Sequence, residues 1–335
     1  MAKPSRPSAH DVARLAGVSQ AAVSRAFTPG ASISQATREK VLQAAQVLGY
    51  RPNLLARSLI KGESGIVGVV VGDMRDPLVA TALNALSGQL SQAGKHMLLF
   101  TAEESAHADR QVEDLLKYRV DALLLMAASL SPQLAERCRE EGIPVIFSNR
   151  QFGRNRAFPS VSSNNRQGAR EIAEHLLQQG YRRPAVVTGS RELYANRERE
   201  SAFAAHISKL GLAAPEVEIG NGDRAGAIPA VRRLLSREQR PDAIFCCNDQ
   251  MAFAALEVAR YEFGLEIGRD IGIAGFGDAE QAAWPSFDLT TYSHSVTAMV
   301  EAILQALLQT PGDNREPAHK IVDGILRIRS STRRD

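Results

Sequence analysis

The stretch HDVARLAGVSQAAVSRAF, from His10 to Phe27, contains two short helical patterns separated by Gly17. Ser8 and Asp11 have the spacing of a capping box at the start of the first pattern, with Asp in place of the usual Glu or Gln. Gly17 ends this helix, and Ser19 can cap the second one. These signals predict two helices joined by a tight glycine turn.

A third helical pattern begins after Ser34 and ends at Gly49. Three short helices with a tight turn between the first two predict a helix-turn-helix. The apolar positions that we expect to face its core are Val12, Leu15, Ala16, Ala22, Val23, Ala26, Phe27, Val41, Leu42, Ala45 and Leu48.

The charge of the chain is unevenly distributed. Residues 1–62 contain nine Lys or Arg and two acidic residues, whereas the remainder contains 31 basic and 35 acidic residues. A basic head on a mildly acidic body favours a polyanionic partner for the head alone. A solvated basic surface without a partner would give the same composition.

A helix-turn-helix places the N-terminal end of its second helix in the major groove of DNA. Gln20 would then meet base edges first and suits adenine, Ala21 can contact a thymine methyl group, and Arg25 can bind guanine. A three-helix interaction module without nucleic acid is the alternative interpretation. The expected phosphate contacts are Ser19, Ser24, Arg38 and Arg51.

The next segment, RPNLLARSLIKGESG, predicts a helix from Asn53 to Ile60. A helix of this length is not stable alone in water, where roughly a dozen residues are needed. We therefore expect it to be ordered only when it docks on a partner. A plain linker is the alternative.

Several stretches together resemble the lactose-repressor (LacI/GalR) family of bacterial transcription regulators. They are DVARLAGVSQAAVSRAF, TREKVLQAAQVLGYRPNLLARSL, GIVGVVVGDMRDP, LLQQGYRRPAVVTG, PDAIFCCNDQMAFAAL, IGIAGFGDAEQAAWPSFDLTTYSH and LRIRSST. The resemblance implies that the short helix is a hinge helix, paired in a dimer, whose Leu59 inserts into the minor groove at the operator centre. Such a wedge unstacks a base step and bends the duplex.

Residues 63–335 alternate continuous apolar runs with helical patterns, which predicts parallel α/β sheets. Their length favours two Rossmann-like lobes, and the resemblance implies a type I periplasmic-binding-protein fold with a ligand cleft between them. We expect a DNA-binding domain at 1–51, a hinge helix and linker at 52–63, and an effector-binding and dimerisation domain at 64–335. The lobe boundary is expected near 163, with later crossings near 294 and 321.

Ligands of open α/β sheets bind at the carboxyl ends of strands, which here carry polar residues. The resemblance adds Arg199, where the family commonly places an effector-binding arginine. Helix capping is the alternative role for Asn248 and Asp249, as surface ion pairing is for Arg150 and Arg199. The expected effector-binding residues are Asp73, Asp76, Arg150, Asn164, Arg199, Asn248, Asp249 and Asp278.

Three positions depart from the family pattern. Gly277 stands where the family often has a sugar-binding Asp, Asn164 stands where it often has Asp, and Leu78 follows a turn where it often has an aromatic residue. Fewer carboxylates beside Arg150 and Arg199 favour an anionic effector. We expect a sugar acid or a phosphorylated sugar.

Other function classes have little support in the sequence. GIAGFG, Gly272 to Gly277, lacks the spacing of a dinucleotide-binding turn, and no catalytic or metal-binding motif is present. No apolar run could span a membrane, and the first residues lack a signal-peptide core, so we expect a cytoplasmic protein. The prediction is a homodimeric, ligand-responsive repressor that binds a near-palindromic operator and is not an enzyme. An activator or corepressor-dependent regulator of the same build is the alternative, ahead of a cleft enzyme or solute-binding protein.

Overall fold

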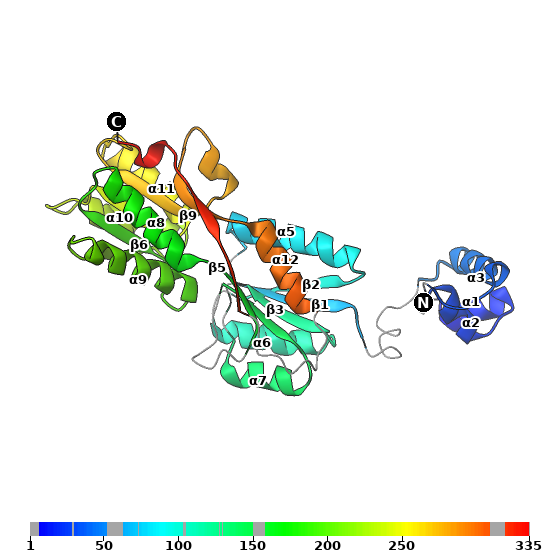
Figure 1. Cartoon of the computed structure of the whole chain (residues 1–335). Coiled ribbons are helices and arrows are strands. Elements are labelled where there is room, and N and C mark those ends of the chain that lie inside the picture. Colours follow the sequence, from blue (N-terminus) through cyan, green and yellow to red (C-terminus); the bar gives the residue numbers. More distant parts are fainter. Residues whose placement is uncertain are drawn as a thin grey trace, which may run out of the picture. The chain divides into compact units, whose positions relative to one another are not determined.

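The computed structural model describes residues 7–28, 30–51, 63–72, 74–102, 105–126, 128, 130–149, 158–308 and 319–334. The chain divides into two compact units, Met1–Ser64 and Gly65–Asp335, both drawn in Figure 1. Leu59 with the whole of the predicted hinge helix, Asp73 and Arg150 lie outside the described residues. No helix in the described part of the chain is long and apolar enough to cross a membrane.

Three helices form the N-terminal unit: α1 (Ala9–Ala16), α2 (Gln20–Ala26) and α3 (Gln35–Leu48). The side chain of a serine caps each of them by accepting a hydrogen bond from a backbone amide, and at Ser8 the capping box with Asp11 is complete. Gly17 and Gly49 end α1 and α3 with φ of 67° and 65°, in the left-handed region that glycine adopts without strain.

The core of this unit is smaller than the sequence pattern predicts. Leu15 and Leu42 were expected to face inwards, but they are 53% and 44% exposed. Ala13 and Ala44 are buried instead, because small side chains allow three short helices to pack closely. The expectation was therefore wrong for both leucines.

Two six-stranded sheets form the second unit, and each is the centre of one lobe (Figure 1). The first lobe has the order β11 (His319–Val322), β5 (Ser160–Ser163), β4 (Val145–Ser148), β3 (Ala122–Met126), β1 (Ile66–Val71), β2 (His96–Thr101). The second lobe has the order β12 (Gly324–Arg327), β10 (Thr290–His294), β9 (Gly272–Gly277), β8 (Ala243–Cys246), β6 (Pro184–Thr188), β7 (Glu216–Ile219). Neighbouring strands are parallel except β10 and β12. The predicted fold class, two parallel-sheet α/β lobes behind a helical head, is confirmed.

Helices cover both faces of each sheet, so the strands are buried and read as continuous apolar runs. In the first lobe, α5 and α12 contribute to one apolar cluster, and α6 and α7 to the other. The helices of the first lobe are α5 (Pro77–Gln92), α6 (Ser105–Leu116), α7 (Pro132–Glu140) and α12 (Val296–Leu307). Those of the second are α8 (Asn165–Gln178), α9 (Tyr194–Lys209), α10 (Arg224–Leu235) and α11 (Asp249–Glu257), which continues as a π-helix, Val258–Glu262.

In the described part of the chain, three segments connect the lobes. They join β5 to α8, β10 to α12, and β11 to β12. Asn164 and Asp323 lie on two of these segments, and Asn164 Nδ2 donates a hydrogen bond to Asp323 Oδ1 at 2.8 Å. The connections therefore lie close enough to be linked by side chains.

Candidate functional site

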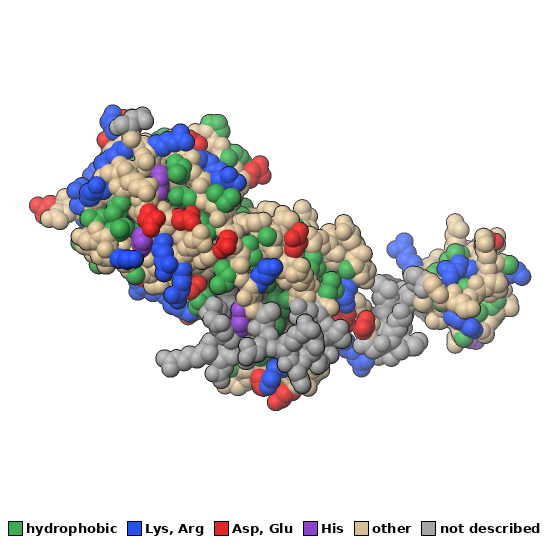
Figure 2. Space-filling model, in the orientation of Figure 1, with side chains coloured by type: hydrophobic (Ala, Val, Ile, Leu, Met, Phe, Trp, Pro, Cys, Tyr) green, Lys and Arg blue, Asp and Glu red, His purple; other side chains and the backbone are tan. Residues whose placement is uncertain are grey.

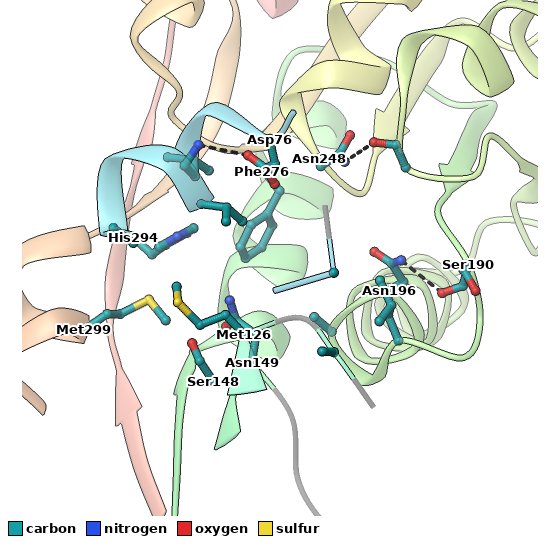
Figure 3. A pocket seen from close by; sticks show the side chains of 18 of the residues that line it. Asp76, Met126, Ser148, Asn149, Ser190, Asn196, Asn248, Phe276, His294 and Met299 are labelled. Carbon is teal, nitrogen blue, oxygen red and sulfur yellow. Dashed lines mark hydrogen bonds between the residues drawn. The ribbon is translucent and has the colours of Figure 1, made fainter. Parts of the chain in front are cut away.

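A cavity of about 310 Å³ lies between the two lobes. Its lining comes from the carboxyl ends of strands in both sheets and from the first turns of α5, α9 and α12, as expected for a ligand site of parallel sheets. Figure 3 shows labelled side chains of both lobes around this space. The volume is at the lower end of the range for small-molecule sites, roughly 300–1,000 Å³.

The two walls of the cavity differ in polarity. The first lobe, including α12, presents a mainly apolar wall made of Leu78, Val79, Ala82, Ala102, Met126, Ala128, Val296, Met299, Val300 and Ile303. The second lobe presents a mainly polar wall that includes Ser190, Glu192, Asn196, Arg199, Asn221 and Asn248. Most of the polar side chains that line the cavity therefore belong to the second lobe.

Arg199 is the buried cation of the cavity. It lies on α9, is 7% exposed, and donates hydrogen bonds from Nε to Asn165 Oδ1 at 2.8 Å and from Nη1 to the Cys247 carbonyl oxygen at 2.7 Å. Its Cζ lies 3.8 Å from the centre of the Phe276 ring. Burial lowers the pKa of Arg199 to about 10, so it is protonated at neutral pH. Nη2 has no hydrogen-bond partner among the described residues and is available to a ligand.

Asn248 caps a helix and also lines the cavity, so the two roles that the sequence left open are compatible. Its Oδ1 accepts a hydrogen bond from the Met251 amide at 2.9 Å and so caps α11, while its Nδ2 donates to the Gly222 carbonyl oxygen at 2.7 Å. It also lines the cavity. Asp76 behaves in the same way: it caps α5 by accepting from the Leu78 amide at 2.9 Å and lines the opposite wall.

Three predicted effector-binding residues lie outside the cavity lining, contrary to expectation. Asn164 caps α8 at a lobe connection. Asp278 forms an ion pair with Arg329 at 2.8 Å. Asp249 is 2% exposed and accepts hydrogen bonds from Thr291 Oγ1 at 2.6 Å and the Ala279 amide at 2.7 Å. The oxygen atoms of these three side chains are therefore engaged by other residues of the protein.

The close approach of the lobes explains the glycine at position 277. A Cβ atom on Gly277 would lie 2.4 Å from Leu78 Cδ1, across the interface between the lobes. The backbone there has φ of 141°, which L side chains rarely adopt. Gly277 and Leu78, two departures from the family pattern, are therefore in contact with each other.

Several lining residues escaped the sequence analysis. Asn196 lies one turn before Arg199 on α9 and donates a hydrogen bond to the Ser190 carbonyl oxygen at 3.0 Å. Its spacing of three residues from Arg199 places both on one helix face, a signal that could have revealed it. Phe276 lies inside the apolar strand β9 and His294 is the last residue of β10, and nothing in the local sequence distinguishes them from core residues.

The candidate nucleic-acid interface is the exposed face of α2. Gln20, Ala21, Ser24 and Arg25 are exposed, while Val23 and Ala26 on the opposite face are buried. Arg25 Nε donates to the Ala21 carbonyl oxygen at 3.3 Å, which keeps its side chain along the helix.

The residues predicted to contact phosphates are also at least partly exposed. Ser19 and Arg51 are exposed and Arg38 is half-buried. The Ser19 hydroxyl group already accepts a hydrogen bond from the Ala22 amide at 3.2 Å as a helix cap. Figure 2 shows Lys and Arg side chains on the surface of the N-terminal unit.

Both parts of the chain match known families. Residues 8–53 match the model described as bacterial regulatory proteins, lacI family, and residues 173–332 match the periplasmic binding protein-like domain. The transcriptional regulator GalS of Salmonella typhimurium is 31% identical over 302 residues, which cover 89% of this chain and 88% of GalS. The regulator CelR of Thermobifida fusca is 28% identical over 335 residues, 97% of this chain and 98% of CelR.

Solved structures agree with these relationships. A CelR–cellobiose complex is 27% identical, covers 97% of this chain and 100% of its own, and superposes with a TM-score of 0.73. The lac repressor dimer bound to operator and the anti-inducer ONPF shares the fold at 24% identity, with a TM-score of 0.87 over 98% of this chain and 100% of its own. This chain belongs to the LacI/GalR family and is a helix-turn-helix transcriptional regulator.

Proposed function

We propose that the chain is a homodimeric repressor of a carbohydrate or sugar-acid utilisation operon, and that an effector bound between the lobes changes its affinity for operator DNA. The observation that carries this proposal is the buried Arg199 guanidinium group in a cavity of a chain that also has an exposed recognition helix. Because it acts on DNA, the regulator is located in the cytoplasm. The relatives are transcriptional regulators, and we assign no catalytic residue.

Operator recognition is assigned to the head. A two-fold symmetric dimer presents two copies of α2 to two half-sites, so the operator is near-palindromic. The lac repressor, whose fold this chain shares, is a dimer bound to operator. Gln20, Ala21 and Arg25 read bases, because they form the exposed face of α2. The backbone contacts assigned to phosphates are Ser19, Ser24, Arg38 and Arg51.

The effector class follows from the polar wall of the cavity. Arg199 and Asn248 contact the ligand from the second lobe, with Asp76 on the first. CelR binds cellobiose in its solved complex, which supports a carbohydrate. A buried cation and the loss of a carboxylate at Gly277 favour an acidic carbohydrate, a sugar acid or a phosphorylated sugar.

The effector acts by favouring one arrangement of the lobes. If the ligand binds better to the arrangement that does not fit the operator, ligand binding lowers the affinity for DNA. DNA binding then lowers the affinity for the ligand by the same factor. Such coupling is commonly worth about 1–3 kcal/mol. A corepressor has the opposite preference, and an activator uses the same parts with a different contact at the promoter.

The first experiment is selection of genomic DNA fragments by the purified full-length protein, with and without a pool of sugar acids and sugar phosphates. Enrichment of a palindrome that disappears with one pool supports an induced repressor. Enrichment only in the presence of a pool indicates a corepressor. No enrichment with any pool, or with cell extract added, contradicts the proposed operator binding.

A further inference from the structure

His294 is a buried cavity residue at a connection between the lobes. It is the last residue of β10, and Ser295 caps α12 directly after it, so the side chain belongs to the segment that leaves the second lobe. It is 9% exposed and lines the cavity. Figure 3 shows its ring extending towards Phe276 and the interior of the cavity.

The ring of His294 has unused hydrogen-bonding capacity. Nδ1 is buried and has no hydrogen-bond partner among the residues that the structure describes. Nε2 is not one of the buried unpaired atoms, and the residue lines the cavity. A ligand cannot reach the buried Nδ1, so Nε2 is the ring nitrogen that is left to bind one.

The charge state of the ring decides what it can offer. Burial lowers the pKa of His294 to about 4; the nearby Arg199 also lowers it, while Asp278 opposes this. The imidazole is therefore neutral at pH 7 and carries one proton. Because a buried N–H without an acceptor is costly, the proton is held at lower cost on Nε2, where the cavity offers space for an acceptor.

His294 and Arg199 both lie close to the ring of Phe276. The Arg199 Cζ is 3.8 Å from the centre of the Phe276 ring, and the centres of the His294 and Phe276 rings are 6.4 Å apart. The carboxylates nearby in the second lobe, Asp249 and Asp278, already accept hydrogen bonds from other residues. Arg199 and His294 thus line the same end of the cavity, next to Phe276.

We propose that His294 Nε2–H donates a hydrogen bond to the effector beside Arg199, and that this pair selects ligands with a carboxylate or phosphate group over those with a hydroxyl group at the same position. The assignment rests on the proposed effector site. An acidic group has several acceptor lone pairs and no proton that would oppose either donor. His294 is therefore a specificity-determining residue located on the connection between the lobes.

The binding test compares matched ligands and matched variants. D-gluconate and D-glucitol differ only by a carboxylate in place of a CH₂OH group; D-glucuronate and 6-phosphogluconate serve as further anionic probes. Calorimetry is carried out with the anion that most raises the melting temperature of the wild-type protein. We expect His294→Leu to weaken its affinity about 10- to 150-fold, as for a lost hydrogen bond to a charged group. His294→Gln, which keeps a donor, should restore most of it, and His96→Gln on the exposed surface of β2 is the control.

A second measurement does not depend on the ligand. ¹⁵N spectra of the imidazole rings, with His294 assigned by its absence in His294→Gln, should show the proton on Nε2 in the free protein. A proton on Nδ1 overturns the proposal. Unchanged affinity in His294→Leu, with weakened affinity in Arg199→Lys, overturns it while leaving the effector site intact. Unchanged affinity in both variants contradicts the effector site itself, and no binding of any anion contradicts the acidic effector class.

Discussion

At the scale of single residues, Arg199 connects several parts of the second lobe. Its guanidinium group joins α9 to the carboxyl end of β8 through the Cys247 carbonyl oxygen and lies on Phe276 of β9. Asn165, the first residue of α8, accepts a hydrogen bond from Arg199 Nε, which is the third contact of the guanidinium group. The planar guanidinium group of arginine makes two hydrogen bonds through its N–H groups and contacts the ring through its face, which the single ammonium group of lysine cannot reproduce.

We predict that Arg199→Lys weakens effector binding at least tenfold and lowers the stability of the body by about 1–3 kcal/mol, because one internal acceptor loses its donor. Operator affinity without effector should stay within about twofold of wild type, since the head is a separate compact unit. Calorimetry, thermal unfolding and a DNA-binding titration measure the three quantities. A normal effector response in this variant would place the effector elsewhere.

Asp249 gives the stability of the body a distinctive dependence on pH. Burial raises its pKa to about 6, although hydrogen bonds from Thr291 and the Ala279 amide oppose this effect. In an unfolded chain an aspartate has a pKa of about 3.9. The folded state therefore binds this proton more tightly, and the contribution of Asp249 to stability increases as the pH falls from above 6 to about 4. The difference is on the order of 3 kcal/mol.

The variant Asp249→Asn separates this effect from other titrating groups. It has no titrating carboxyl group and can keep both hydrogen bonds, with Oδ1 accepting from the Ala279 amide and Nδ2 donating to the Thr291 hydroxyl, so we expect its stability to lack the pH dependence that Asp249 contributes. Relative to this variant, the wild-type protein should gain stability between pH 7.5 and pH 5. Parallel curves for the two proteins would show that Asp249 does not titrate in this range.

At the scale of elements, α2 is the part of the head whose role is most open to test. Its exposed face carries Gln20, Ala21 and Arg25, and only Arg25 is charged. We predict that Arg25→Ala costs about 1–3 kcal/mol of specific operator binding and relaxes base preference at one position of each half-site. Competition titrations with single-base operator variants measure both effects. An equal loss for all variants would assign Arg25 to a phosphate instead.

The contact between β9 and α5 offers a second test at this scale. We predict that Gly277→Ala destabilises the body by about 1–3 kcal/mol, through the strained φ, and also weakens effector binding, through the clash with Leu78. The double variant with Leu78→Ala should recover the binding but not the stability. Strictly additive effects of the two substitutions on binding would mean that the lobes do not meet there.

The elements that could be predicted are those with an apolar pattern. Eight continuous apolar runs of the body correspond to β1, β2, β3, β4, β6, β8, β9 and β10. Of the other four strands, β5 and β7 were not recognised, because their composition is polar. β5 is SVSS, with buried serines such as Ser160, whose Oγ bonds to His319 Nδ1 at 2.9 Å, and β7 is EVEI at a sheet edge. Both are strands because they pair with neighbouring strands of the sheet, and the local sequence carries no information about that pairing.

At the scale of the whole molecule, the site could be predicted only as far as the fold decides it. The carboxyl ends of the strands were correctly expected to meet, which brings Asp76 and Asn248 to the cavity together with Arg199. Which strand-end side chains face the cavity depends on small rotations of the backbone. Asp249 and Asp278 bond to other residues of the protein, whereas Phe276 and His294, which the sequence did not single out, line the cavity.

The late return of the chain to both sheets has a consequence for protein synthesis. β11 and β12 are edge strands of different lobes and come from the last residues of the chain, whereas the head is complete within Met1–Ser64. At about 5–20 residues per second, the ribosome needs roughly 15–55 s to add the rest. During this time each nascent chain carries a finished DNA-reading unit without a finished control unit. A late nonsense mutation makes this condition permanent, so such alleles should lose effector response together with the stability of both lobes.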